Sequence, residues 1–316
     1  MGNGAPRILV TGGAGFIGAS MVRALEARGD QVRILDDGRA AGFDAIAGTA
    51  AEVIPDDLLT TDLGVALQGI DGVIHLAAQT VIATSIEQPL SDLRDNVEGT
   101  VRLLEAARAA GSPRFILASS SAVLGPSEMP AREADVPAPA VPYGAAKAAA
   151  EAYLLAYHAT HGMVTTSVRF ANAYGPYSWH KSSVIPAFIR HLLGGDPLIV
   201  YGDGQQTRDF VHVDDIVRLV LRVLDAPSDD VAGRVFHGGS GRQTSVAQLA
   251  DVVIRAGRRP GRIEHHSARP GDIAHSSLDI SRATEVLGHQ PRVELADGVA
   301  ATIAWFEATG RSSPAG

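Results

Sequence analysis

Short apolar runs alternate with longer stretches of helical spacing through the first half of the chain. Runs rich in β-branched residues predict strands at 7–11, 31–35, 53–54, 73–78, 114–119 and 165–170. Apolar positions at helical spacing predict helices at 16–28, 92–110 and 143–161. Nearly continuous apolar strands that alternate with helices are typical of a parallel sheet covered on both faces. The sequence therefore predicts an α/β fold built on a doubly wound parallel sheet.

The second half of the chain is more often interrupted by glycine and proline. Helices are predicted at 185–193, 214–224 and 246–256. We expect one lobe over residues 1–175 and a smaller, partly interleaved C-terminal lobe mainly over residues 176–316. Segments at about 205–240 are expected to return to the first lobe.

Composition narrows the classes of function. The chain has 316 residues, a net charge of −8 and no cysteine. The acidic balance argues against a nucleic-acid partner, and the lack of cysteine excludes thiol nucleophiles, zinc thiolates and disulfides. No apolar run approaches the length of a membrane span, and there is no apolar signal-peptide core. No metal is expected, since the pair His265 and His266 lacks further ligands. We expect a soluble, cytoplasmic protein.

A glycine-rich turn follows the first predicted strand and opens the first helix. Gly12, Gly15 and Gly18 permit a tight turn and let the backbone approach a pyrophosphate, which the helix N-terminus attracts. Asp36 ends the second strand, where a carboxylate accepts hydrogen bonds from ribose hydroxyls and repels a 2′-phosphate. The turn therefore predicts a dinucleotide site that favours NAD over NADP. Arg39 could instead pair with a 2′-phosphate, but we interpret it as a solvated loop residue.

A tyrosine and a lysine predict acid–base chemistry. Tyr143 and Lys147 stand four residues apart near the start of a predicted helix and so share one face. A free tyrosine, with a pKa of about 10, is a poor base at neutral pH. A neighbouring ammonium and a positive nicotinamide favour the phenolate. The pair follows a strand that ends in three serines, Ser119 to Ser121.

Several ordered motifs span nearly the whole chain, namely TGGAGFIG, HLAAQ, NVEGT, ASSSAVLG, PYGAAK, RFANAYGP, YGDGQQTRDFVHVDD and RPGD followed by LDISRATEVLG. Together they resemble the extended short-chain dehydrogenase/reductase family. Later segments resemble its branch of nucleotide-sugar epimerases and dehydratases, of the UDP-glucose 4-epimerase type. That family joins a Rossmann lobe that binds NAD to a smaller lobe that binds a nucleotide sugar.

The resemblance implies roles for individual residues. Tyr143 would be the base on the sugar 4-hydroxyl, Lys147 would tune it and bind the nicotinamide ribose, and Ser120 would hydrogen-bond the same oxygen. Asn96 would support this network. The implied cofactor contacts are Gly12, Gly15, Phe16, Ile17, Gly18, Asp36, Asp37, Asp57, Leu58, Leu76, Ala77, Ala78, Gln79, Asn96, Ser119, Tyr143, Lys147 and Phe170. The implied substrate contacts are Ser121, Asn172, Ile185, Tyr201, Arg208, Arg269 and Asp272, of which Asn172, Arg208 and Arg269 match diphosphate positions.

The reaction is less sharply defined than the family. Members that are 4,6-dehydratases carry an Asp-Glu pair where this chain has Ser121 and Ala122, and this departure favours a 4-epimerase. The segment GPYSWHK at residues 175–181 looks more like the dehydratase form, and Leu124 replaces a tyrosine that both groups usually have. The alternative is therefore a dehydratase, either of the 4,6-type or of the 5,6-type found in tunicamycin-type antibiotic pathways.

Two further expectations follow from the resemblance. The substrate is expected to be a UDP-hexose or UDP-hexosamine, with thymidine as the other candidate base. The two alanine-rich helices predicted at 92–110 and 143–161 would pair with a second copy of the chain in a homodimer. A remote alternative is a protein that senses a dinucleotide without catalysis, and Ser120, Tyr143 and Lys147 together argue against it.

Overall fold

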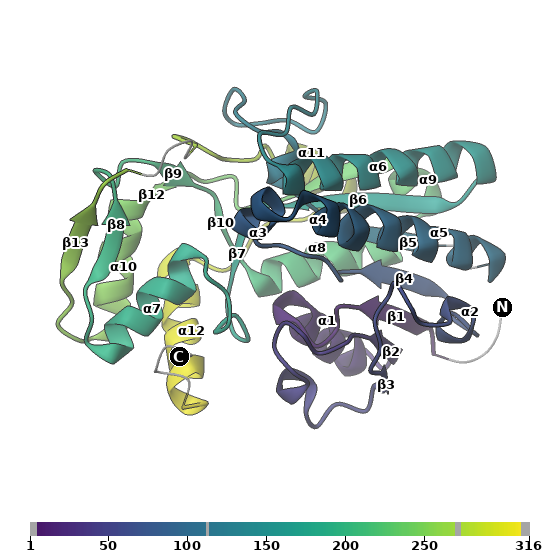
Figure 1. Cartoon of the computed structure of the whole chain (residues 1–316), viewed down its shortest axis with the longest axis horizontal. Coiled ribbons are helices and arrows are strands. Elements are labelled where there is room, and N and C mark those ends of the chain that lie inside the picture. Colours follow the sequence, from purple (N-terminus) through teal and green to yellow (C-terminus); the bar gives the residue numbers. More distant parts are fainter. Residues whose placement is uncertain (1–4, 112–113, 269–272, 311–316) are drawn as a thin grey trace.

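A seven-stranded parallel sheet forms the centre of the larger lobe in the computed structural model (Figure 1). The structure describes residues 5–111, 114–268 and 273–310. The two halves of the sheet wind in opposite directions from β1, which lies between β4 and β2. In spatial order the strands are β11 (Arg234–Gly238), β6 (Val164–Phe170), β5 (Arg114–Ser120), β4 (Gly72–His75), β1 (Arg7–Thr11), β2 (Gln31–Leu35) and β3 (Glu52–Ile54). This arrangement confirms the predicted Rossmann-type sheet.

Alternation along the strands sends apolar side chains into two cores, one on each face of the sheet. In β1, Ile8 and Val10 join one core and Leu9 joins the other. The helices over the first face are α1 (Phe16–Ala27), α8 (Val213–Asp225), α9 (Ser228–Val231) and α11 (Ser281–Leu287). Those over the second face are α2 (Leu63–Ala66), α5 (Gly99–Ala109) and α6 (Pro142–His161). Because both faces are covered, the strands read as continuous apolar runs.

The smaller lobe has its own apolar core, centred on α7, α10 and α12. It lies beside the sheet, with short strand pairs at its edge and at the junction between the lobes (Figure 1). Its elements and the connecting pairs are β7 (Asn172–Tyr174), α7 (Val184–Gly194), β8 (Leu198–Tyr201), β9 (Thr207–Arg208), β10 (Phe210–His212), β12 (Thr244–Ser245), α10 (Val246–Gly257), β13 (Ile263–His266) and α12 (Leu295–Ala308). The chain then crosses back to the larger lobe, where α8 packs on one face of the sheet and β11 pairs with β6 at its edge.

The predicted helix over 92–110 is confirmed as a continuous helical segment, which begins earlier, at Pro89, and widens in the middle. It consists of α4 (Pro89–Leu93), a wide π-helical turn η2 (Arg94–Glu98) and α5. The Asn96 amide donates to the Gln79 carbonyl and to Asp92, and Thr100 donates to the Asn96 carbonyl. The Asn96 side chain is thereby held inward, towards the end of β4, where the turn widens.

The other differences between the predicted and the observed elements are small. The strand predicted at 73–78 ends at His75, and the strands at 7–11 and 31–35 are confirmed with the same bounds. The pattern did not predict β11, α12 or the short strand pairs of the second half. The remaining short elements are α3 (Ile82–Glu87) and the 3-10 turns η1 (Asp44–Ile46) and η3 (Ser121–Val123). Within the described residues, no helix is both long and apolar enough to cross a membrane.

Candidate active site and cofactor pocket

The glycine turn lies at the carboxyl end of β1, where the strand order reverses. Gly12 has a φ of +71°, and a Cβ there would lie 2.6 Å from the Ala77 backbone nitrogen. A Cβ on Gly18 would lie 2.0 Å from the Gly12 carbonyl oxygen. No side chain caps the N-terminus of α1 at Gly15, so its N–H groups remain for a ligand. A switch point with a bare helix N-terminus fits the pyrophosphate of a dinucleotide.

Asp36 stands at the end of β2 and closes one side of the turn. Its carboxylate accepts from the N–H groups of Ala14 at 2.9 Å and Gly38 at 2.8 Å. Burial raises the pKa of Asp36, and these two hydrogen bonds oppose that rise. Arg39 is exposed and pairs with Asp37 and, at 3.2 Å, with Asp57. Because carboxylates hold Arg39, the pocket fits NAD better than a cofactor with a 2′-phosphate.

Ser120, Tyr143 and Lys147 meet where β5 ends and α6 begins. Tyr143 is 9% exposed and Lys147 is 2% exposed. Burial raises the pKa of Tyr143 to about 12, and a side-chain hydrogen bond with Ser120 opposes that rise. Burial lowers the pKa of Lys147 to about 8, and its ammonium donates to the Ala118 carbonyl at 3.0 Å. Tyr143, the candidate base, and the Lys147 ammonium therefore lie together in one buried site, as their spacing in the sequence predicts.

Asp92 is a charged member of this neighbourhood that the sequence analysis missed. It is 1% exposed, and its Oδ1 accepts from the Gln79 and Asn96 side chains at 3.1 and 3.0 Å. Its Oδ2 is buried without a hydrogen-bond partner. The negative charge of Asp92 raises the pKa of both Tyr143 and Lys147. An aspartate four residues before Asn96 was the available signal, but it resembles any polar helix position.

Ser119 points away from this cluster into a buried ion pair. Its hydroxyl donates to Glu151, whose carboxylate accepts from Arg169 at 2.9 and 2.8 Å. Both charged side chains are nearly inaccessible to solvent. Glu151 also raises the pKa of Lys147. This pair joins β6 to α6 and so holds the helix that carries Tyr143.

The other predicted cofactor residues surround the same edge of the sheet. Leu76, Ala77, Ala78 and Gln79 follow β4, and the Gln79 amide hydrogen-bonds the backbone of Val81. Phe16 and Ile17 begin α1 beside the glycine turn. Asp57 and Leu58 follow β3, and Phe170 ends β6 against the core.

The predicted substrate residues are more dispersed. Asn172 begins β7 and donates twice to the Asp209 carbonyl, and Arg208 donates to the carbonyls of Thr207 and Ile273. Ile185 is buried in the core of the smaller lobe, and Tyr201 lies edge-on to the His266 ring. Ser121 opens η3 beside Ser120, and Arg269 and Asp272 lie outside the described residues.

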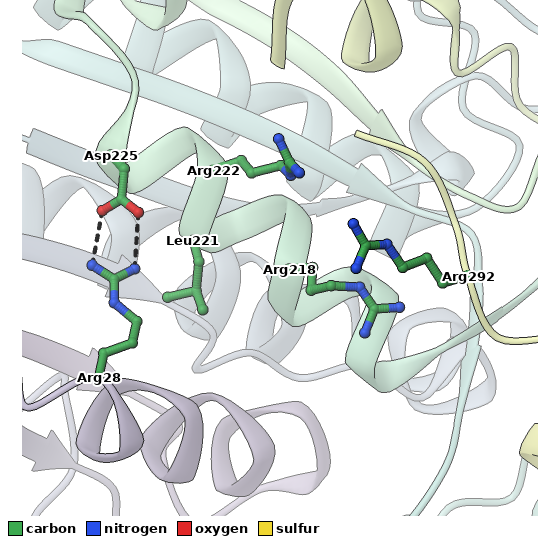
Figure 2. A pocket seen from close by; sticks show the side chains of 6 residues that line it. All are labelled: Arg28, Arg218, Leu221, Arg222, Asp225 and Arg292. Carbon is green, nitrogen blue, oxygen red and sulfur yellow. Dashed lines mark hydrogen bonds and ion pairs between the residues drawn. The ribbon is translucent and has the colours of Figure 1, made fainter. Parts of the chain in front are cut away.

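A group of arginines lies elsewhere on the larger lobe, apart from the candidate site. Figure 2 shows a hollow lined by Arg28, which directly follows α1, by two arginines of α8, and by Arg292 of the segment before α12. Arg28 pairs with Asp225 at 2.8 Å, Arg218 pairs with Asp215, and Arg222 donates to the Leu287 carbonyl. These arginines hold protein acceptors, and the hollow contains none of the candidate site residues. Among the residues that the structure describes, no cluster of His, Asp or Glu forms a metal site.

A buried tyrosine and lysine stand at the same edge of the sheet as the dinucleotide turn, and this fold and site define the class of short-chain dehydrogenases/reductases. The match to a family model takes the identification further. The model described as the NAD dependent epimerase/dehydratase family matches residues 8–239. The chain belongs to this family.

Individual relatives define the substrate class. The chain is 39% identical over 311 residues to a UDP-glucose 4-epimerase of Mycolicibacterium smegmatis, covering 95% of this chain and 98% of that protein. It is 36% identical over 314 residues to a dTDP-glucose 4,6-dehydratase of Streptomyces niveus, covering 95% and 92%. The solved UDP-glucuronic acid 4-epimerase of Bacillus cereus, in complex with UDP-glucuronic acid and NAD, matches with a TM-score of 0.89 at 29% identity, covering 96% and 99%. The protein is an NAD-dependent enzyme that acts on nucleotide sugars.

Proposed function

We propose that the protein is a 4-epimerase of a UDP-hexose or UDP-hexosamine. The observation that carries this choice concerns carboxylates near Tyr143. In the described part of the chain, the carboxylate whose charge acts on Tyr143 is Asp92, and two side-chain amides hold it. A 4,6-dehydratase needs acid and base groups for the C5 and C6 protons in addition to the base at O4. The positions after Ser120 are Ser121 and Ala122, which supply no carboxylate.

The residues divide the work of such a reaction. Tyr143 takes the proton of the sugar 4-hydroxyl and later returns it, while the Ser120 hydroxyl donates to the same oxygen. The Lys147 ammonium favours the phenolate form of Tyr143. NAD, when bound against Gly12, Gly15 and Asp36, supplies a hydride acceptor and donor next to C4. Asn172 and Arg208 are proposed to bind the diphosphate, with Arg269 as a third contact.

Product analysis tests the proposal against its alternative. We expect UDP-glucose or UDP-N-acetylglucosamine, incubated in D₂O, to give the C4 stereoisomer with no deuterium on carbon. Mass spectrometry and proton NMR would follow both species. A product lighter by one water would instead establish a dehydratase, and its new alkene or ketone would show which type. NAD binding without turnover of any nucleotide sugar would favour the sensing role.

Replacing Asp92 by asparagine is expected to shift the pH profile of kcat. A nearby negative charge raises the pKa of both Tyr143 and Lys147, so its removal lowers both. The rising limb reports Tyr143 losing its proton, and the falling limb reports Lys147 losing its own. Both limbs should therefore move to lower pH, with the optimum kcat within about tenfold of wild type. Asparagine can still accept from Gln79 and Asn96, so a lower kcat with unmoved limbs would indicate only a structural role.

Two wider expectations belong to this proposal. The exposed apolar residues Ile82, Ile86, Leu90 and Leu93 lie on α3 and α4, next to α6. The same helices of a second copy would cover this exposed apolar surface, which therefore supports a homodimer. A cytoplasmic location agrees with a chain that has no cysteine to oxidise.

A further inference from the structure

Lysine is almost absent from this protein. The sequence holds two lysines among 27 lysine and arginine residues, and they are Lys147 and Lys181. Lys147 belongs to the candidate active site described above. The chain therefore uses arginine wherever a basic side chain serves elsewhere on its surface, and Lys181 is the exception that needs an explanation.

Lys181 lies where the two lobes meet. It belongs to the loop between β7 and α7, and its Nζ donates at 2.8 Å to the hydroxyl of Thr80, 101 residues earlier in the chain. Thr80 directly follows Gln79, in the loop between β4 and α3. Figure 1 shows α3 at the end of the larger lobe that faces α7. The ammonium thus bridges the loop on the cofactor side to the loop that follows Asn172.

The loop that carries Lys181 is fixed by hydrogen bonds. Arg190 of α7 donates through one guanidinium nitrogen to the carbonyls of Trp179 and Lys181. The Ser178 hydroxyl donates to the Gly175 carbonyl at 2.6 Å, and the Lys181 N–H donates to the Ser178 carbonyl at 2.9 Å. These bonds hold the backbone at Lys181, from which the side chain reaches Thr80.

The ammonium lacks a compensating charge. Lys181 is half-buried, and within the described ranges no carboxylate lies within ion-pair distance of it. Burial lowers the pKa of its ammonium, with no acidic group that opposes the change. Thr80 accepts one of its three N–H donors, which leaves two for a ligand. A partly desolvated cation with spare donors is suited to an anionic group that enters between the lobes.

We propose that Lys181 is a substrate-binding residue whose ammonium binds an anionic oxygen group of the nucleotide sugar. The inference rests on the proposed function, since it takes the ligand to be a nucleotide sugar. The diphosphate of the proposed substrate has this chemistry, and a sugar of the hexuronic class would add a C6 carboxylate. A lysine suits either, because its compact point charge adapts to one oxygen where the planar guanidinium of arginine demands a forked partner.

Binding measurements on the NAD-loaded protein test this assignment. Calorimetric titrations with UDP, UDP-glucose and UDP-glucuronic acid would compare wild type with Lys181→Met, which keeps the chain length and removes the charge. The control is Thr80→Val, which removes the contact between the lobes but leaves the ammonium. If Lys181 binds substrate, Lys181→Met should raise Kd about 30-fold or more, and Thr80→Val should change it less than about threefold.

The ligand series identifies the group. A loss confined to UDP-glucuronic acid assigns the ammonium to the carboxylate, and an equal loss with all three ligands assigns it to the diphosphate. Unchanged affinities in Lys181→Met, or an equal loss in Thr80→Val, would overturn the proposal in favour of a contact that only joins the lobes. Wild-type protein that retains NAD but binds none of the three would overturn the proposed function itself.

Selective labelling gives a second measurement if Lys181→Met fails to fold. Protein labelled only in lysine should show two side-chain NMR signals, since the sequence has two lysines. The signal that disappears in Lys181→Arg belongs to Lys181. That signal should shift on addition of ligand to the wild-type protein, and a signal that does not respond would contradict direct binding.

Discussion

Replacement of Tyr143 by phenylalanine should lower kcat by about a thousandfold or more while NAD stays bound. The substitution removes one hydroxyl, the group proposed to take the proton from the sugar, and general-base catalysis contributes about 10²–10⁴-fold. The aromatic ring remains to fill its buried position at the start of α6. The loss should appear in kcat for each nucleotide sugar that the wild-type enzyme turns over, measured alongside the NAD content of the purified variant.

A second tyrosine on the same helix provides the matched control. Tyr157 also loses one hydroxyl in Tyr157→Phe, but that hydroxyl donates to Glu105 on the surface side of α6. This variant should keep kcat within about twofold of wild type, since the hydroxyl that it removes binds Glu105 and no residue of the candidate site. Near-normal turnover in Tyr143→Phe would disprove the assignment of the base.

The pKa of Tyr143 shows why the base needs its surroundings. Burial, together with the charge of Asp92, raises it to about 12. Ser120 opposes the rise, and Lys147 and a bound nicotinamide add positive charge beside the phenol. Each pKa unit by which they lower it corresponds to about 1.4 kcal/mol. Loss of NAD should therefore leave Tyr143 protonated at neutral pH, so the site is active only when loaded.

The sequence predicted the parts of the fold that local pattern determines. The strand at 7–11 has the predicted bounds because its apolar run, Ile8 to Val10, is buried on both faces of the sheet. The strand at 31–35 also has the predicted bounds, although Arg33 interrupts its apolar run. Tyr143 and Lys147 came together because four residues bring side chains to one face of a helix. β11 is different, since RVFHG gives a weak pattern and its strand is defined by pairing with β6, about 70 residues earlier.

The residues that were missed depend on contacts between distant segments. Asp92 resembles a solvated helix aspartate until the fold brings Gln79 and Asn96 against it. The widened turn at Asn96 likewise follows from its bond to the Gln79 carbonyl, which no helical pattern contains. Lys181 is a special case, because the scarcity of lysine is visible in the sequence and its contact with Thr80 is visible only in the fold.

The glycine turn provides the second large expected effect. Gly12→Ala should lower NAD affinity at least 100-fold and reduce the free energy of unfolding by about 2–5 kcal/mol. Two effects contribute to the loss of stability. An L-residue in the left-handed region costs roughly 1–2 kcal/mol, and overpacking costs about 1–3 kcal/mol. The overpacking arises because the new Cβ would lie 2.6 Å from the Ala77 backbone nitrogen and 2.8 Å from its Cα. Backbone atoms cannot rotate away, so the end of β4 and the turn must separate.

Gly29→Ala separates the strain of the backbone from the crowding at the turn. Gly29 has a φ of +88°, and a Cβ there would meet nothing within 4 Å. This variant should lose only about 1 kcal/mol of stability in urea titrations and should bind NAD as the wild type does. If Gly12→Ala also kept wild-type affinity, the pyrophosphate could not lie on this turn. Loss in Gly12→Ala alone would mean that the close approach of β1 and β4, and not the left-handed backbone, makes glycine necessary at residue 12.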